Sequence, residues 1–339
     1  MSSPPPKTKL IECPSRKSPY IKWGHFVDGG NGYLYGIPHY ARQVLEMNIE
    51  DKSIKSIGPL LTNVQYWSGI RADNGSIYCI PDGIETDYFL KITPKEEEGV
   101  DAEVKILADR PLPESGYNWW REGVLAKDGC IYYLPFEASH VLKLDPSCGD
   151  SLSLVGDEFE SNRFEGAVLG ENNCIYGTSE DANIKFDPTK NSVLKLVSGC
   201  FDEHDCCYGY GGVLAADGNI YTSNACGQIV KIDTAKNCYT LIGNAIINYD
   251  GPCFGLPVLG ADKCIYFPPH KYDCVLQFNP ITHSMSFVGD SYKVQRWYGG
   301  ALASDGFIYY ASYFHQSVLQ VDAHPLNEII LEFVKKSIG

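Results

Sequence analysis

Arginine and glutamate side chains occur at irregular places along this chain, each close to a glycine that opens a strand-like segment. Because buried charges are costly unless they are paired, these residues could form salt bridges between neighbouring structural units. The same set could instead clamp an anionic ligand, or a carboxylate (Glu122 or Glu165) could act as a general base. The residues are Arg71, Arg121, Glu122, Arg163, Glu165 and Arg296.

Histidines form a second set of potentially reactive side chains. His39 and His270 each follow a proline, fall at the same point of two sequence repeats and are candidate catalytic bases. His315 lies two positions further on in its own repeat, while His140 and His25 hold other positions. Imidazole suits zinc, iron or copper, but these histidines lack the local spacing of a metal site. Solvated loop histidines are therefore the alternative interpretation.

The densest run of metal-ligating side chains is the loop Asp202-Glu-His-Asp-Cys-Cys207. Its carboxylates would suit Ca²⁺ or Mg²⁺, and its histidine with two thiols would suit Zn²⁺. Adjacent cysteines chelate one ion poorly, so a solvated acidic loop is the alternative. The cofactor stays unknown, with these three divalent metals left open. The sequence has no Gly-x-Ser-x-Gly elbow, phosphate-binding glycine loop or His-Glu-x-x-His motif.

An aromatic residue precedes a glycine once in each sequence repeat. If the repeats form a closed circle, these side chains surround one end of a central channel. They could wedge neighbouring units together, or they could form an apolar pocket floor or a collar that docks a protein, since aromatic residues dominate interface hot spots. The aromatic residues are Trp23, Trp67, Trp120, Phe164, Tyr210, Phe254 and Tyr298, and all but Trp23 are candidate ligand contacts, together with Arg71, Arg121 and His315.

One short module recurs seven times and must supply the elements that position these side chains. Each copy ends in a tyrosine, and successive tyrosines are 43, 54, 44, 45, 45 and 43 residues apart. The long interval contains an acidic insertion, 95–101, which we expect to be a surface loop. Repeats of about 45 residues are typical of propeller blades. The modules are Gly32–Tyr35, Gly75–Tyr78, Gly129–Tyr132, Asn173–Tyr176, Gly218–Tyr221, Lys263–Tyr266 and Gly306–Tyr309.

The third repeat shows what one unit contains. Residues 122–126 and 131–134 flank an Asp128-Gly129 pair, which is a strong signal for a hairpin turn. Two further strand-like pieces follow at 141–144 and 151–155. Four short antiparallel strands in each of seven units predict an all-β fold, a seven-bladed β-propeller.

The propeller is expected to fill residues 21–339 as a single domain, after a flexible tail over residues 1–20. A first strand near His25 and a fourth strand at 328–333 imply that the termini exchange no strand, although residues 9–12 could add one at the edge of a sheet.

Composition narrows the partners and the compartment. The formal net charge of −14 argues against a nucleic-acid partner and against docking on anionic lipid. No run approaches the roughly 18 apolar residues that cross a bilayer, and no apolar stretch resembles a secretory signal. The cysteine count is odd at 13, and Cys130, Cys174 and Cys264 share one repeat position. We therefore expect buried free thiols in a reducing, cytoplasmic compartment.

The segment Ala216-Asp-Gly-Asn-Ile-Tyr221 followed by Gly227-Gln-Ile-Val-Lys-Ile-Asp233 resembles blades of NHL, SMP-30 and streptogramin-lyase-like propellers. The resemblance covers all seven units through a short module. It implies a propeller superfamily whose members include lactone hydrolases, a lyase acting on a cyclic peptide antibiotic, and interaction modules.

Two functions remain open. The first is a binding propeller that presents a loop-rich, aromatic and charged face to a protein or a small molecule. The alternative is a small-molecule lyase or hydrolase that uses a carboxylate or histidine at the channel mouth, with a divalent metal as an optional cofactor. Convergence of Glu122, Glu165, Arg121, His39 and His270 on one pocket would favour the enzyme, and pairing between blades would favour binding.

Overall fold

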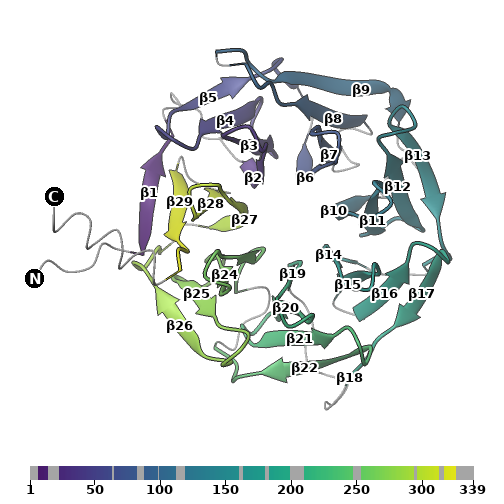
Figure 1. Cartoon of the computed structure of the whole chain (residues 1–339), viewed down its shortest axis with the longest axis vertical. Helices are drawn as coiled ribbons and strands as arrows, with labels where there is room; N and C mark the ends of the chain where they lie inside the picture. Colours follow the sequence, from purple (N-terminus) through teal and green to yellow (C-terminus); the bar gives the residue numbers. More distant parts are fainter. Residues whose placement is uncertain are drawn as a thin grey trace, which may run out of the picture.

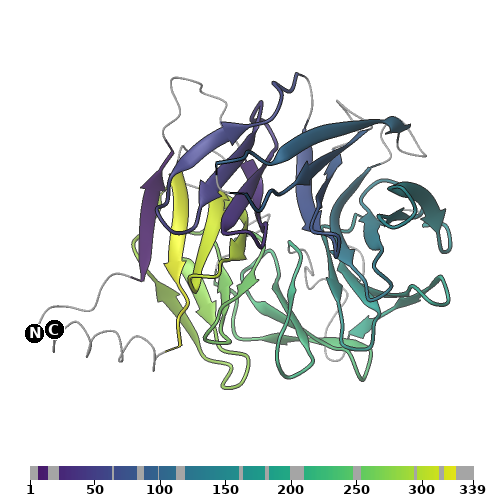
Figure 2. The ribbon, with the colours of Figure 1, turned by 45° about the horizontal axis from the view of Figure 1, so that its top comes forward.

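The computed structural model is an all-β ring of seven sheets, which confirms the seven-bladed propeller expected from the repeats (Figure 1). Each sheet runs outward from the centre of the ring (Figure 1), and Figure 2 shows the same ring turned by 45°. Among the described residues no helix is long and apolar enough to cross a membrane. The structure describes residues 7–13, 23–62, 65–81, 88–97, 99–111, 119–159, 163–179, 183–198, 210–246, 253–293, 296–312 and 317–325.

Each blade is an antiparallel sheet whose first strand lies nearest the axis (Figure 1). Blades 1 to 3 are β2 (Trp23–Asp28), β3 (Tyr33–Pro38), β4 (Val44–Asn48) and β5 (Ile54–Ile57); β6 (Tyr66–Arg71), β7 (Ile77–Pro81), β8 (Tyr88–Thr93) and β9 (Glu103–Pro111); and β10 (Trp120–Leu125), β11 (Ile131–Pro135), β12 (Val141–Asp145) and β13 (Ser151–Val155). Blades 4 to 6 are β14 (Gly166–Leu169), β15 (Ile175–Thr178), β16 (Asn183–Asp187) and β17 (Ser192–Lys195); β19 (Val213–Leu214), β20 (Ile220–Ser223), β21 (Ile229–Asp233) and β22 (Cys238–Ile242), which β18 (Val197–Ser198) joins in parallel; and β23 (Val258–Leu259), β24 (Ile265–Phe267), β25 (Val275–Phe278) and β26 (Met285–Val288). Blade 7 is β27 (Trp297–Leu302), β28 (Phe307–Ser312), β29 (Ser317–Asp322) and β1 (Thr8–Glu12).

The first residue of every repeated module sits in a left-handed turn. These seven residues have φ angles between 61° and 87°, in the hairpin that joins the first two strands of a blade. Glycine adopts this conformation without a steric cost, and asparagine tolerates it better than most residues do. The turn geometry therefore explains why five of the seven positions are glycine and one is Asn173.

The tyrosine that ends each module is held by the residue four positions before it. In all seven blades the phenol oxygen forms a hydrogen bond of 2.6–3.1 Å with an Asp carboxylate or an Asn amide in the hairpin turn. The tyrosine rings themselves are buried. In each module this hydrogen bond thus fixes the hairpin turn of the blade to its second strand.

The hydrophobic cores lie between neighbouring blades rather than inside single sheets. One core joins Tyr35 and Ile37 of blade 1 to Tyr66 and Leu90 of blade 2. Each fully buried side chain of this size stabilises the fold by about 1.5–3 kcal/mol. The blades therefore hold each other in place, and the ring must close for its last interface to form.

Ring closure differs from the expectation that the termini exchange no strand. β1 pairs antiparallel with β29, from Thr8 opposite Val321 to Glu12 opposite Ser317. It supplies the outermost strand of blade 7 (Figure 2). The edge strand foreseen at residues 9–12 is therefore confirmed, and it lies within the predicted tail. The strand predicted at 328–333 lies outside the described residues.

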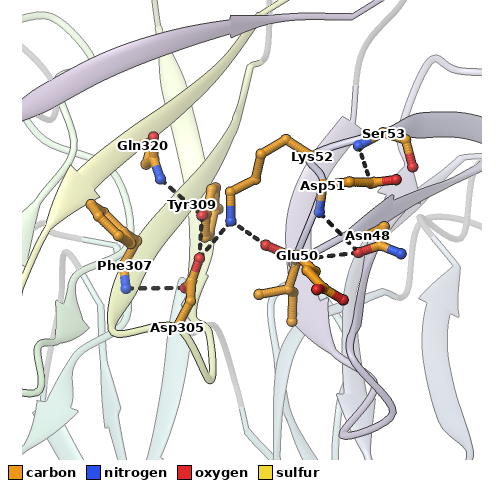
Figure 3. Close-up of polar contacts among 10 residues, drawn as sticks. Asn48, Glu50, Asp51, Lys52, Ser53, Asp305, Phe307, Tyr309 and Gln320 are labelled. Carbon is orange, nitrogen blue, oxygen red and sulfur yellow. Dashed lines mark hydrogen bonds and ion pairs between the residues drawn. The ribbon is translucent and has the colours of Figure 1, made fainter.

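A second contact joins the first and last blades, on the side of the hairpin turns (Figure 3). Lys52, in the β4–β5 turn of blade 1, forms an ion pair of 2.6 Å with Asp305 of blade 7 and donates a hydrogen bond to the Ile49 carbonyl. Asp305 also accepts the hydrogen bond from Tyr309. The carboxylate of Asp305 therefore holds Tyr309 in blade 7 and, at the same time, pairs with Lys52 of blade 1.

Candidate functional site

The innermost strands carry β-bulges where they begin, at the end of the channel that faces the loops between the second and third strands. In β6, β10 and β27 two residues lie opposite one residue of the neighbouring strand. A bulge re-aims side chains that a regular strand would send elsewhere, and such bulges are frequent next to functional sites. The residues inside these bulges are Trp67-Ser68, Arg121-Glu122 and Tyr298-Gly299.

Seven side chains, one from each blade, form a connected group at this end of the channel, which we call the axial cluster. Trp67 and Tyr298 lie 6.0 Å apart between ring centroids, and Tyr298 and Tyr210 lie 4.8 Å apart. These rings come from blades that are not adjacent, so they reach across the axis. His39 packs on Trp67 at 4.4 Å, and His270 packs on Tyr210 at 5.5 Å. The members are His39, Trp67, Arg121, Glu165, Tyr210, His270 and Tyr298.

Arg121 is the central charge of the axial cluster. Its guanidinium lies 4.4 Å from the Trp67 ring centroid and 3.5 Å from that of Phe136, and it forms an ion pair with Glu165 of the next blade. The Glu165 side chain is 1% exposed. Inter-blade pairing of Arg121 is therefore confirmed. Arg163 pairs instead with Glu137, at 2.8 Å, and not with the predicted carboxylates.

Glu122 follows Arg121 in the same bulge of β10 and is buried. Burial, together with the nearby charge of Glu165 and against that of Arg121, raises the pKa of Glu122 to about 8. A carboxyl group with this pKa is mostly protonated at neutral pH and is then able to donate a hydrogen bond. No salt bridge to Glu122 occurs among the described residues, so the two predicted carboxylates have different roles.

Several buried polar atoms at the axis have no hydrogen-bond partner among the described residues. They are the Trp67 indole nitrogen, Arg121 Nε, Glu122 Oε1, Tyr298 OH and His25 Nδ1. Burial also lowers the pKa of His25 to about 4, which keeps its ring neutral, and raises the pKa of Tyr298 well above its usual value. Buried polar groups in folded proteins are nearly always paired, so this concentration of unpartnered atoms at one place is unusual.

The aromatic residues predicted to surround the channel fall into two groups. Trp67, Tyr210 and Tyr298 belong to the axial cluster. Trp120, Phe164 and Phe254, like Trp23, are buried in the cores between blades, and the Trp120 indole donates to the His140 carbonyl at 2.8 Å. For these residues the wedge interpretation is correct, because each ring packs in a core between two neighbouring blades.

Arg71 does not belong to this site. It ends β6, so it lies at the opposite end of the channel, about 16 Å along the strand from Tyr66 at about 3.3 Å per residue. Its guanidinium lies against Gly30 in the β2–β3 turn, where an added Cβ would approach it to 2.5 Å. Its predicted place near a strand start was wrong. His315 and the loop Asp202–Cys207 lie outside the described residues.

One residue of the site was missed in the sequence: Phe136, whose ring lies against the Arg121 guanidinium. His25, one of the histidines named from the sequence, lies half-buried beside Gly299 of β27. The sequence did contain a pattern that could have predicted which aromatic rings reach the axis. Two inner strands begin with paired aromatic residues, and in each the first ring is buried between blades while the second reaches the axis. These pairs are Tyr66-Trp67 and Trp297-Tyr298.

No group of three or more His, Cys, Asp or Glu side chains that could hold a metal occurs in the described part of the chain. His39 and His270 contact different rings, Trp67 and Tyr210, and they belong to blades 1 and 6. The described geometry therefore supplies aromatic faces, hydrogen-bond donors and one protonated carboxyl group.

The fold and the axial cluster define a seven-bladed propeller with a polar, aromatic site at one end of its channel. The chain is similar to a streptogramin B lyase at 13% identity, over 94% of this chain and 98% of that one, with a TM-score of 0.75. It is also similar to a catalytically inactive virginiamycin B lyase from Staphylococcus aureus with quinupristin (12%; 93% and 99%; 0.74) and to YCF48 bound to D1 peptide (11%; 94% and 96%; 0.67). The expected likeness to streptogramin-lyase-like propellers is thus confirmed at the level of the fold. No protein-family model and no curated protein matches the chain.

Proposed function

We propose that this propeller binds a small molecule at the axial cluster. The observation that carries the proposal is the convergence of one side chain from each blade on the axis, with buried polar atoms that lack partners among the described residues. Trp67, Tyr210 and His270 are half-buried, which leaves part of each ring open to a ligand.

Structural neighbours give this proposal further support. The virginiamycin B lyase structure contains quinupristin, and YCF48 is bound to a peptide, so propellers of this shape bind both small molecules and peptides. We favour a small molecule, because the unpartnered atoms of Glu122, Tyr298 and His25 are buried. A flat protein surface would not reach them.

A second candidate function is catalysis by general acid–base chemistry. It is favoured by Glu122, because a catalytic group works best when its pKa lies near the working pH. Glu165 is the less suitable carboxylate, since it is already engaged in the ion pair with Arg121. A hydrolase or lyase of this kind would place its reacting atom against Glu122.

Native mass spectrometry of the protein purified from its own source tests the proposal. Binding predicts a retained small molecule in the wild-type protein and its loss in Trp67→Ala. The matched control is Arg71→Ala, because Arg71 lies on the same strand as Trp67 but at the other end of the channel. An apo mass for wild type, or a mass that carries a partner chain instead, would contradict the proposal.

We also propose a reducing, cytoplasmic location. All cysteines in the described ranges are free thiols, and Cys130, Cys174 and Cys264 are buried as expected. Alkylation of the protein in denaturant, straight after isolation, should modify every thiol. Detection of disulfide-linked peptides would contradict this location.

A further inference from the structure

We infer that the ligand of the axial cluster is a neutral molecule that presents two or more acceptor oxygens, such as amide or ester carbonyls, next to an aromatic or apolar group. This inference rests on the proposed small-molecule site and names the class of molecule that the site would hold.

The unpartnered atoms at the axis are mainly hydrogen-bond donors. The Trp67 indole nitrogen and Arg121 Nε can only donate, and the Tyr298 hydroxyl can donate. None of the three has a partner among the described residues. A ligand rich in acceptors would satisfy all three donors at once, whereas a ligand rich in donors would leave them unpaired.

The charges at the axis balance without a ligand. Arg121 is neutralised by Glu165, with which it forms an ion pair. Glu122 is neutral at pH 7, because burial and the charge of Glu165 raise its pKa to about 8. A charged ligand would therefore enter a buried site without a free counter-charge, which is unfavourable. The formal net charge of −14 further disfavours an anion.

Aromatic side chains form the apolar part of the site. Trp67, Tyr298 and Tyr210 follow one another across the axis with their rings tilted or edge-on. The outer faces of Trp67 and Tyr210 are partly open, and a ring of the ligand would pack against them. Carbonyl groups on the same molecule would then reach the donors beneath.

Because Glu122 ionises, the affinity of the site for its ligand should depend on pH. The titratable groups that face Glu122 are Arg121, Glu165, Tyr133 and Tyr298. Above pH 8 Glu122 loses its proton, so the site loses a donor and gains a negative charge. Binding of an acceptor-bearing ligand must weaken as this happens.

Three matched probes test the ligand class by ligand-observed NMR titration. They are N-acetylphenylalaninamide, which is neutral, N-acetylphenylalanine, which is an anion, and phenylalaninamide, which is a cation at about pH 6. At this pH we expect the neutral probe to bind at least about ten-fold more tightly than either charged probe. Trp67→Ala should abolish this binding, and Arg71→Ala should not change it.

Raising the pH to about 9.5 should weaken binding of the neutral probe to wild type by about ten-fold. Glu122→Gln cannot ionise, so its Kd should not depend on pH; loss of all binding in this variant would equally support direct contact by Glu122. Tighter binding of a charged probe, failure of all three probes, or an identical pH dependence in Glu122→Gln would overturn the ligand class. The native-mass experiment decides the binding function independently of these probes.

Discussion

Arg121 of blade 3 and Glu165 of blade 4 form an ion pair that crosses a blade interface at the very end of the channel. The guanidinium is held between the rings of Trp67 and Phe136, at 4.4 and 3.5 Å. The pair therefore links two blades and, at the same time, orders the side chains that face the axis. A purely structural salt bridge would not need to stand among aromatic rings with unpartnered donors.

Glu165→Gln should lower the free energy of unfolding by about 3 kcal/mol, because it leaves the half-buried charge of Arg121 without its partner. The matched control is Glu137→Gln, which breaks the pair with Arg163. The Arg163 side chain is 61% exposed, so this loss should stay below about 1 kcal/mol. Denaturant unfolding measures both values. Equal losses in the two variants would show that the Arg121–Glu165 pair stabilises the fold no more than an exposed ion pair does.

Glu122 should make the protein less stable as the pH rises. Its folded pKa of about 8 lies above the ordinary value of 4.5 for a glutamate, so the folded state binds more protons than the unfolded state between these values. The contribution of Glu122 to stability should fall across this window by a total on the order of 5 kcal/mol. Glu122→Gln should remove this slope. Thermal unfolding at several pH values measures it, and an unchanged slope in the variant would mean that Glu122 is ionised in the folded state.

His25 should have the opposite effect at acid pH. Burial lowers its pKa to about 4, so the unfolded state binds more protons between pH 4 and 6.5. His25 should destabilise the folded state by on the order of 3 kcal/mol as the pH falls through this range, which offsets the gain from Glu122 between pH 6.5 and 4.5. In His25→Gln this loss should be absent, so the stability of the variant should rise relative to that of wild type as the pH falls. A variant whose stability follows that of wild type across this range would place the acid response elsewhere.

Removal of residues 1–12 should destabilise the ring, because β1 is the outermost strand of blade 7. Leu10 and Ile11 pack against the cores on either side of that blade, and their loss should lower the free energy of unfolding by about 2–4 kcal/mol. Lys9→Glu is the control, since Lys9 is exposed on the same strand. A truncated protein as stable as wild type would show that closure does not depend on β1.

The fold could be predicted because the repeat encodes local geometry. A left-handed turn such as that at Gly129, and a hydrogen bond such as that from Tyr132 to Asp128, depend on residues close in sequence. The site depends instead on which residues of an inner strand fall inside its bulge. Trp67 and Trp120 both come shortly before an inner-strand glycine. Trp67 lies inside its bulge and faces the axis, whereas Trp120 precedes its bulge and lies in a core. That choice depends on packing between blades, which one sequence does not reveal.

Ring closure escaped prediction for a related reason. Residues 328–333 and 9–12 are both strand-like, and the sequence does not say which of them pairs with β29. The structure assigns residues 8–12 to this place, with Leu10 opposite Leu319. A choice between two competing edge strands is decided by tertiary contacts, such as the hydrogen bond of 2.6 Å from Tyr292 to Thr8.

A crystal structure of the protein purified from its own source would test the central claim most directly. We predict electron density for a small molecule at the axial cluster, with acceptor atoms within hydrogen-bond distance of the Trp67 indole nitrogen, Arg121 Nε and the Tyr298 hydroxyl. The contrary result would be that these three donors bond to other groups of the chain itself, with no molecule between the rings of Trp67 and Tyr210. The axial cluster would then be a structural hub, and the binding function would have to be abandoned.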